Sequence, residues 1–268
     1  MAILVTGAGG LLGRAAVRAL LRQGVEHVRA VVRDPDQAPG LRRLGARAAV
    51  MDAADPDAME AVLDGVHTAV GLAGSLWTTP EDGADAVAGP WAALTTAAAR
   101  AGVARLVLVV PPGADPDDPN AYLAGCGRAA ALVAASGVPG VVLRCPHVLG
   151  GTGGLVRHLR GGTAPGPGSQ RAAPVLAGDV AAAIAAVDAA AEPPARLDLG
   201  GAEVLTMTDL AALVRDSSSP APPPLTATQR DYLARDSVVP PTGWAELGLE
   251  PHPVGLDLTV APGGPLAR

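Results

Sequence analysis

Apolar residues follow two alternating patterns along the first half of the chain. Short apolar runs, such as AILV at residues 2–5 and RLVLVV at 105–110, predict buried strands. Between the strands, apolar residues recur at helical spacing, as in the stripe formed by Leu12, Ala16 and Leu20. This alternation predicts an α/β fold, a Rossmann-type doubly wound parallel sheet.

The first strand is joined to the first helix by a glycine-rich turn. Gly7, Gly10 and Gly13 lie between strand and helix, where glycine lets the backbone approach a pyrophosphate and the helix N-terminus supplies amide donors. Arg33 and Asp34 follow the second strand. An arginine there pairs with the 2′-phosphate of NADP, whereas an acidic residue accepts a hydrogen bond from the free ribose 2′-hydroxyl of NAD. Because Arg14 also follows the last glycine, we predict NADP(H) as the cofactor, with NAD(H) as the less favoured alternative.

Cofactor contacts are expected at the ends of several strands of this sheet. The third strand ends near Asp52, and small residues follow the fourth strand, where a cofactor lies over the sheet. The residues predicted to bind the cofactor are Gly7, Gly9, Gly10, Leu11, Leu12, Gly13, Arg14, Arg33, Asp52, Ala53, Leu72, Ala73, Gly74 and Cys145.

After residue 150 the chain becomes rich in glycine and proline. Such a segment is a lid over a pocket or a connector, with a short helix around Leu155 to Leu159. We predict an NADP-binding core over 1–150 and a small C-terminal part, 151–268, that mainly forms the substrate site and lid, while 174–200 returns to the core.

Composition and charge exclude several classes of function and partner. Of the 268 residues 49% are hydrophobic, but Phe is absent, so the core must rely on Ala, Val and Leu. All 20 basic residues are Arg, the net charge is −6, and no basic block exists, which argues against nucleic acid as a partner. No apolar run is long enough to cross a bilayer. No spacing of His, Cys or acidic residues suggests a metal site. A small-molecule substrate and a monomer or homodimer are expected.

The two cysteines, Cys126 and Cys145, form no paired motif, and Met1 leads directly into the first strand without an export signal. A reduced, cytoplasmic protein is therefore expected.

Several motifs occur together in one order: VTGAGGLLGR, VVRDP, DAADPDAMEAVLDGV, GVVLRCPHVLGG and VLAGDVAAAIAAV. The chain resembles the extended and atypical short-chain dehydrogenase/reductases, in particular their NmrA-like and NAD-dependent epimerase/dehydratase branches. The resemblance implies an NAD(P)H-dependent oxidoreductase. It also implies that Arg144, Cys145, Pro146 and His147 carry the chain past the nicotinamide.

The resemblance further implies a Ser or Thr, a Tyr and a Lys in the active site. Here Pro111 and Pro112 follow the fifth strand, Tyr122 opens the next helix, and Cys126 stands four residues later, where the lysine is expected. The triad is therefore degenerate. A phenol with a pKa of about 10 is protonated at neutral pH and can donate a proton to the alkoxide formed during reduction. Oxidation of an alcohol instead needs the tyrosinate as a proton acceptor, which the lysine favours by lowering the tyrosine pKa. Losing the lysine should therefore impair oxidation more than reduction.

Tyr122 and His147 are the candidate proton donors, each with an alternative role in packing. Trp77, Trp91, Tyr122, Tyr232 and Trp244 are candidate ring-stacking surfaces. The preferred hypothesis is an NADPH-dependent ketone reductase, for example of an aromatic polyketide whose own phenol assists the reaction, or of another secondary metabolite, as in antibiotic biosynthesis. The alternatives are a non-redox cyclase or isomerase and an NADP-sensing regulatory protein.

Overall fold

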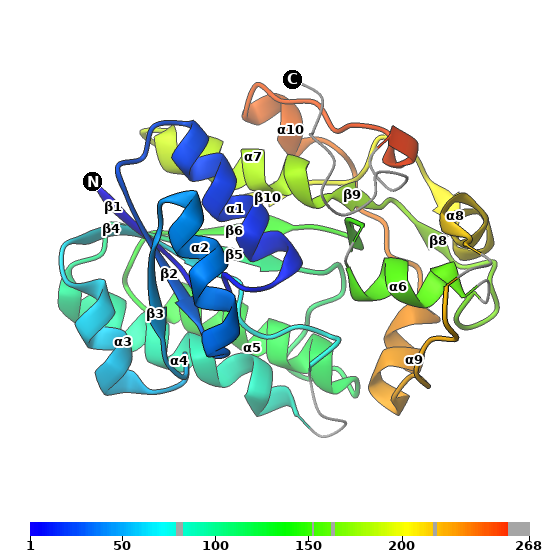
Figure 1. Ribbon diagram of the computed structural model, residues 1–268, viewed down its shortest axis with the longest axis horizontal. Coiled ribbons are helices and arrows are strands. Elements are labelled where there is room, and N and C mark those ends of the chain that lie inside the picture. Colours follow the sequence, from blue (N-terminus) through cyan, green and yellow to red (C-terminus); the bar gives the residue numbers. More distant parts are fainter. Residues whose placement is uncertain (79–82, 152, 162–163, 217–218, 257–268) are drawn as a thin grey trace.

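The fold is built on one parallel sheet, shown in the computed structural model of Figure 1, which describes residues 1–256 apart from 79–82, 152, 162–163 and 217–218. The sheet has seven strands in the order β3-β2-β1-β4-β5-β6-β10, and each neighbouring pair is parallel. This order confirms the predicted doubly wound Rossmann-type α/β sheet, because the chain changes direction between β1 and β4. The strands are β1 (Ala2–Val5), β2 (His27–Val32), β3 (Arg47–Val50), β4 (Val66–Gly71), β5 (Arg105–Val110), β6 (Gly140–Arg144) and β10 (Arg196–Asp198).

Helices cover both faces of the sheet because each contributes an apolar surface to one of two cores. One core packs α1, α2 and α7 against one face, around Leu20, Leu41 and Ile184. The opposite core packs α3, α4 and α5, around Leu63 and Leu94, and Figure 1 shows the two helical layers. These helices are α1 (Leu11–Arg22), α2 (Ala38–Leu44), α3 (Pro56–Leu63), α4 (Ala84–Ala101), α5 (Ala121–Ala135) and α7 (Ala177–Ala189), with a 3-10 turn η1 (Pro35–Gln37) before α2.

The start of α4 differs from the sequence prediction. The composition of residues 75–90, SLWTTPEDGADAVAGP, predicts a loop up to Pro90, whereas the helix begins at Ala84 and includes Pro90. Proline costs a helix one internal hydrogen bond. Burial of Val87, Trp91 and Leu94 in the second core offsets that cost, so tertiary packing overrides the local signal.

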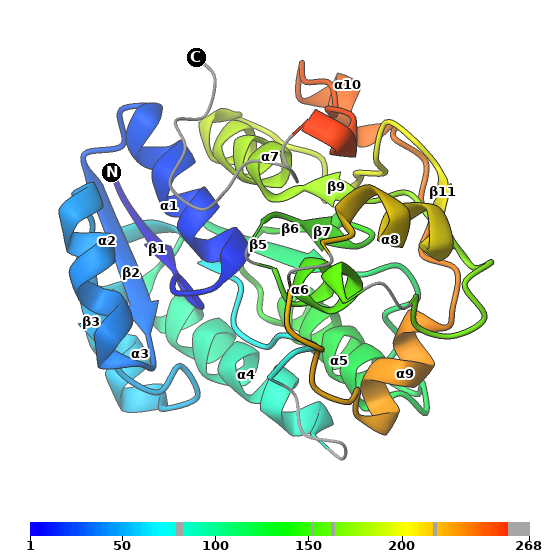
Figure 2. The same cartoon turned by 45° about the vertical axis from the view of Figure 1, so that its right-hand side comes forward.

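The C-terminal segments build a third core beside the main sheet. Leu155, Leu159, Leu210 and Leu233 meet there, and Figure 2 shows α6, α8 and α9 on the same side of the molecule. The short helix predicted after residue 150 is α6. The elements of this part are β7 (Val148–Leu149), α6 (Gly154–Arg160), β8 (Arg171–Ala172), β9 (Val175–Leu176), β11 (Leu205–Thr206), α8 (Met207–Val214), α9 (Ala227–Leu233), α10 (Gly243–Glu246) and η2 (Val254–Leu256). The final residues of the predicted C-terminal part, 257–268, lie outside the described residues.

A buried arginine fixes α7 to the sheet. Arg105 begins β5, and its guanidinium donates to the carbonyl oxygens of Val187, Asp188, Ala190 and Ala191 at distances of 2.6, 2.9, 2.9 and 3.1 Å. The carbonyls at a helix C-terminus lack partners within the helix and carry partial negative charge. Arg105 therefore supplies both the hydrogen bonds and the positive charge that this end requires.

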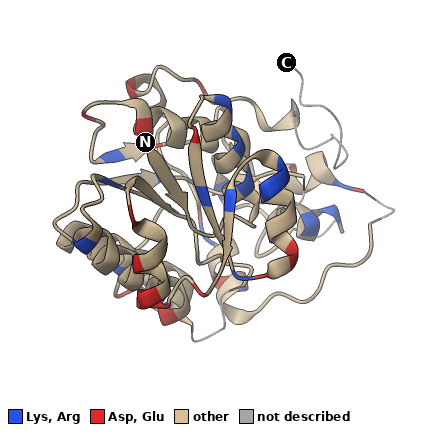
Figure 3. Cartoon of the chain, turned by 60° about the vertical axis from the view of Figure 1, so that its left-hand side comes forward, with Lys and Arg blue, Asp and Glu red and all other residues tan. Residues whose placement is uncertain are grey.

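Charged side chains are spread over the surface. In the face shown in Figure 3, arginines and acidic residues are distributed over several helices and loops. Ion pairs such as Arg100–Glu60 and Arg128–Asp85 are exposed and contribute little stability. Among the described helices, none combines the length and apolar character required to cross a membrane.

Candidate active site

The glycine-rich turn between β1 and α1 is folded tightly. Gly7 has a φ of 63°, and a Cβ on Gly13 would lie 2.3 Å from the Gly7 carbonyl oxygen, so neither position accepts a side chain without rearrangement. The Gly10 amide donates to the same oxygen at 3.0 Å. Because α1 begins after Gly10 with no side-chain cap, its first amides are available to an anion. This glycine cradle fits the pyrophosphate of a dinucleotide.

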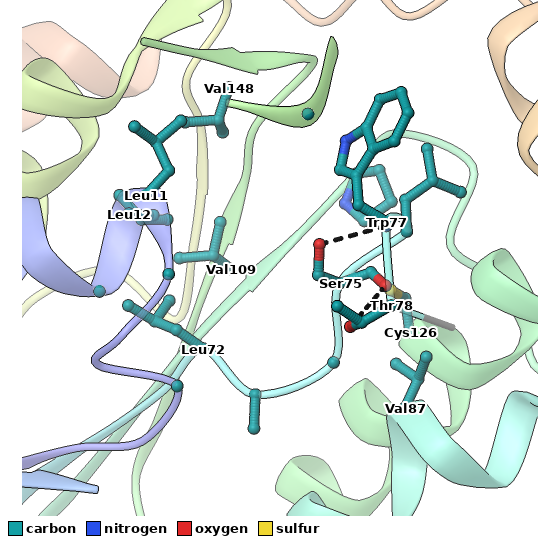
Figure 4. A pocket seen from close by; sticks show the side chains of 18 of the residues that line it. Leu11, Leu12, Leu72, Ser75, Trp77, Thr78, Val87, Val109, Cys126 and Val148 are labelled. Atoms are coloured by element: carbon teal, nitrogen blue, oxygen red, sulfur yellow. Dashed lines mark hydrogen bonds between the residues drawn. The ribbon is translucent and has the colours of Figure 1, made fainter. Parts of the chain in front are cut away.

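A cavity of about 690 Å³ extends from this turn across the carboxyl ends of β1, β4, β5 and β6. In Figure 4, Leu11 and Val148 lie on one side of it, and Trp77 and Cys126 lie on the other. Most residues predicted to bind the cofactor line it, namely Gly7, Gly9, Gly10, Leu11, Leu12, Gly13, Arg14, Leu72, Ala73, Gly74 and Cys145. The structure thus brings together residues that lie far apart in the sequence.

Three other residues predicted to bind the cofactor do not line this cavity. Arg33 is exposed after β2, and Asp52 and Ala53 follow β3, where the Asp52 carboxylate accepts from the Ala54 amide at 3.0 Å. Sequence reasoning placed them by their position at strand ends. The cavity, however, lies over the middle of the sheet, whereas β2 and β3 lie towards its edge.

Gln37 was not singled out in the sequence. Its side chain lines the cavity and lies against Gly9, where a Cβ would fall 1.6 Å from its Oε1. It therefore closes the glycine turn on the side of η1. The only local signal is a polar residue at the end of η1, a feature too common to indicate a cofactor site.

At the other end of the cavity lies the first turn of α5. Asn120 caps this helix, accepting from the amides of Tyr122 and Leu123 at 3.1 and 3.3 Å. Tyr122 and Cys126, one turn apart, both line the cavity. Burial, with smaller contributions from Cys126 and Tyr232, raises the pKa of the Tyr122 phenol well above its ordinary value. Burial likewise raises the pKa of the Cys126 thiol to about 12, so both groups remain protonated and neutral.

The end of β5 contributes Pro111 to the cavity wall. Proline has neither a hydroxyl group nor an amide hydrogen, so it cannot bond a carbonyl oxygen. The structure therefore places Pro111 and Cys126 at a site where two polar groups are expected by resemblance, and it leaves Tyr122 as a phenol without a neighbouring lysine.

His147 follows β6 and also lines the cavity. The side chain is buried, and its Nε2 atom has no hydrogen-bond partner within the described residues. Burial lowers the pKa of His147 to about 4, so the imidazole is neutral at physiological pH. In the neutral state it is a hydrogen-bonding group and not a ready acid.

The buried imidazole should make stability depend on pH. Its pKa is about 4 in the folded protein and about 6.5 when unfolded, so the unfolded chain binds more protons between these values. This contribution is present above pH 6.5 and is lost as the pH falls towards 4. We expect the loss of this contribution to lower the free energy of unfolding by about 2 kcal/mol when the pH falls from 7 to 5, as measured by urea denaturation.

The variant His147→Leu should lose this part of the pH dependence. His27→Gln, at the exposed start of β2, is the matched control and should keep the wild-type dependence. An equal pH dependence in His147→Leu and in the wild type would show that the imidazole is not held neutral by burial.

Tyr232 of α9 occupies a position in this site that the sequence did not reveal. Its ring lies edge-on to Tyr122, with centroids 5.3 Å apart, and edge-on to His147, with centroids 5.4 Å apart. The sequence indicates Tyr232 only as one of several rings able to stack. Its place between two candidate donors follows from the docking of α9, which no local pattern encodes.

Potential metal ligands do not converge in the described part of the chain. No group of three or more His, Cys, Asp or Glu side chains is arranged there to hold an ion.

The strand order, the glycine cradle and the position of the cavity define a dinucleotide-binding fold. Residues 7–190 match the NAD(P)H-binding family, and because this segment covers more than half of the chain, the protein belongs to that family. The family match agrees with the fit of the glycine turn to a dinucleotide.

Solved structures with the same fold include enzymes of the epimerase/dehydratase type. A double mutant of dTDP-glucose 4,6-dehydratase from Streptomyces venezuelae, determined with NAD bound, is 21% identical with a TM-score of 0.73, covering 94% of this chain and 92% of that one. UDP-glucose 4-epimerase from Thermotoga maritima is 20% identical with a TM-score of 0.75, covering 96% of each chain. An NADPH-dependent quinone oxidoreductase from Escherichia coli is 23% identical with a TM-score of 0.62, covering 79% and 73%.

Among curated proteins, the chain is similar to a short part of a much larger one. It is 37% identical over 92 residues to the pikromycin polyketide synthase component PikAIII of Streptomyces venezuelae, which is 31% of this chain and 6% of that protein. The similarity therefore concerns one small segment of the synthase component.

Proposed function

We propose that the protein is an NADPH-dependent reductase that converts a ketone on a small molecule into an alcohol. The observation that carries this proposal is the protonated Tyr122 phenol at the end of a cavity that begins at the glycine cradle. Because burial raises its pKa, the phenol stays protonated at neutral pH and remains a hydrogen-bond donor, whereas the phenolate that would act as a base is not populated. The site is therefore suited to the direction of reaction that consumes a proton.

The residues that would hold the cofactor are the glycine cradle, Arg14 and the backbone after β4. Arg14 Nε donates to the Gly9 carbonyl at 3.0 Å, which keeps its guanidinium beside the cradle. Within the described part of the chain, neither Arg14 nor Arg33 takes part in an ion pair, so both remain available to a 2′-phosphate. Asp34, the alternative ribose ligand, instead accepts from the Asp36 amide at 2.9 Å. These contacts support NADP(H) over NAD(H).

When bound, NADPH supplies the reducing equivalent for the carbonyl carbon. The Tyr122 phenol would donate a hydrogen bond to the carbonyl oxygen and then pass its proton to that oxygen as negative charge develops. Pro111 cannot provide a second donor. The neutral His147 imidazole, or a hydroxyl group of the substrate beside the ketone, would complete the donor set.

Polyketides and other secondary metabolites are the substrates that we favour. The support is the similarity of a segment to a polyketide synthase component, together with the mainly neutral lining of the cavity. A polyketide ketone bears no charge, and a cavity of about 690 Å³ falls within the usual range for a small-molecule ligand.

Mixing the protein with NADPH and a set of ketones tests the proposal. Loss of NADPH absorbance together with formation of an alcohol is the expected result. Tight NADPH binding without consumption by any ketone would favour a regulatory protein. Conversion of a substrate without cofactor consumption would favour a cyclase or isomerase.

A further inference from the structure

The chain concentrates its aromatic residues at one place. It has 3 Trp, 2 Tyr and no Phe, and Trp77, Trp91, Tyr122 and Tyr232 all line the candidate active site. The remaining ring, Trp244, is buried in the first core. Trp91 and Tyr232 also belong to the second and third cores, but four of the five Trp and Tyr rings line this cavity, which points to a ligand that rings can contact.

The rings reach the cavity from different layers of the fold. Trp77 comes from the loop after β4 and packs against the start of α6, since a Cβ on Gly154 would lie 2.3 Å from the indole. Trp91 lies beneath the site, against Gly71 of β4. Tyr232 stands edge-on to both Tyr122 and His147. Trp77, Trp91 and Tyr232 thus line the same cavity as the phenol of Tyr122, and we call this part of the cavity the slot.

Tyr232 is held in the slot by a network that joins α9 to the start of α5. The Asn120 amide donates to the Thr228 carbonyl at 2.9 Å and to the Asp231 carboxylate at 2.8 Å, while its own oxygen caps α5. Arg235 pairs with Asp118 at 2.8 Å and with Asp231 at 2.6 Å. The helix that carries Tyr232 and the helix that carries Tyr122 are thereby fixed to each other.

Charged groups are scarce in the cavity. Among the residues that line it, Arg14 and Arg157 are the charged ones; Arg14 lies at the glycine cradle, and Arg157 is an exposed residue of α6. The slot itself contains neutral rings and a neutral imidazole. A nucleotide sugar would bring two phosphate charges, and among the described lining residues Arg157 is the one basic side chain away from the glycine cradle that could meet them.

From this arrangement we infer that the substrate carries a flat, uncharged aromatic ring and that Tyr232 is the residue that selects it, by forming the wall on which that ring packs. The inference rests on the proposed function, because it assigns the substrate class of the same site. Tyr232 acts on binding of the substrate ring, and Tyr122 acts on the reacting oxygen.

Equilibrium binding of 1-naphthol to the protein saturated with NADP⁺ tests the slot without requiring turnover. Tyr232→Ala should weaken this binding about 30-fold, because it removes the aromatic wall, with NADP⁺ affinity unchanged. Tyr232→Phe restores the ring and should recover the binding. Asn120→Asp keeps the helix cap but loses the amide donor and faces Asp231, so it should also weaken 1-naphthol binding.

Turnover gives the second readout. Tyr232→Ala should lower kcat/KM about 30-fold for the aromatic ketone 1-tetralone but less than threefold for cyclohexanone. An equal loss for both ketones, or 1-naphthol binding that is the same in Tyr232→Ala and wild type, would overturn the inference. If 1-naphthol binds in a Tyr232-dependent way but no ketone is reduced, the slot stands and the proposed reductase function fails.

Discussion

Replacing Gly13 with alanine should abolish measurable NADPH binding, with an affinity loss of at least about 100-fold. The added Cβ would lie 2.3 Å from the Gly7 carbonyl oxygen and 2.6 Å from the Ala8 Cα atom. Both are backbone atoms, so the clash cannot be relieved by rotating a side chain. The glycine turn must then open, and the first amides of α1 no longer point to one anion. Fluorescence titration of the protein with NADPH measures the effect.

The matched control is another helical glycine. Gly178 lies in α7 with no atom within 4 Å of a Cβ, so Gly178→Ala should bind NADPH like the wild type and gain slight stability from helix propensity. Circular dichroism of both variants separates loss of binding from loss of folding. Wild-type affinity in a folded Gly13→Ala variant would show that this turn does not hold the cofactor.

Replacing Tyr122 with phenylalanine should lower kcat for ketone reduction by roughly 100- to 10,000-fold, the range for removal of a general acid. The ring and its contact with Tyr232 are retained, and NADPH affinity should not change, because Tyr122 lies away from the glycine cradle. Since burial keeps the phenol protonated, the rate in the wild type should not rise as the pH is raised from 6 to 9. Steady-state kinetics of both proteins across this pH range provide the test.

Two results would remove Tyr122 from the mechanism. One is a kcat for Tyr122→Phe within threefold of the wild type. The other is a reduction rate that increases with pH in the wild type and not in the variant, because such a profile requires a phenolate base. In either case the donor would have to be sought in His147 or in the substrate.

Local sequence signals account for much of the fold and for the glycine turn at one end of the cavity. The glycine turn and the apolar strands are determined by neighbours in the chain, and the structure has them at the expected places. Asp55 followed by Pro56 is a local signal of the same kind for the start of α3, which Asp55 caps. The elements around Pro90 were misjudged because burial of a helix face outweighed a local breaker. Long-range packing is what the sequence pattern alone does not express.

The donor end of the site shows the same limit. Tyr122 and His147 were found through resemblance, but their relation to Tyr232 depends on hydrogen bonds that span more than 100 residues, such as Asn120 to Thr228. Gln37 was overlooked because its role comes from the way η1 folds back on the glycine turn. Arg33, which was assigned from its strand end, lies outside the cavity lining, and its contact with a 2′-phosphate stays a prediction.

Transfer of deuterium from labelled NADPH to a ketone tests the central claim most directly. NADPH deuterated at the C4 position of the nicotinamide is incubated with the protein and 1-tetralone, and the product is analysed by mass spectrometry. The reductase account predicts an alcohol that carries one deuterium on the former carbonyl carbon, with an equal amount of NADP⁺ formed. A converted product without the label, or NADPH that is bound but never consumed by any ketone, would contradict it.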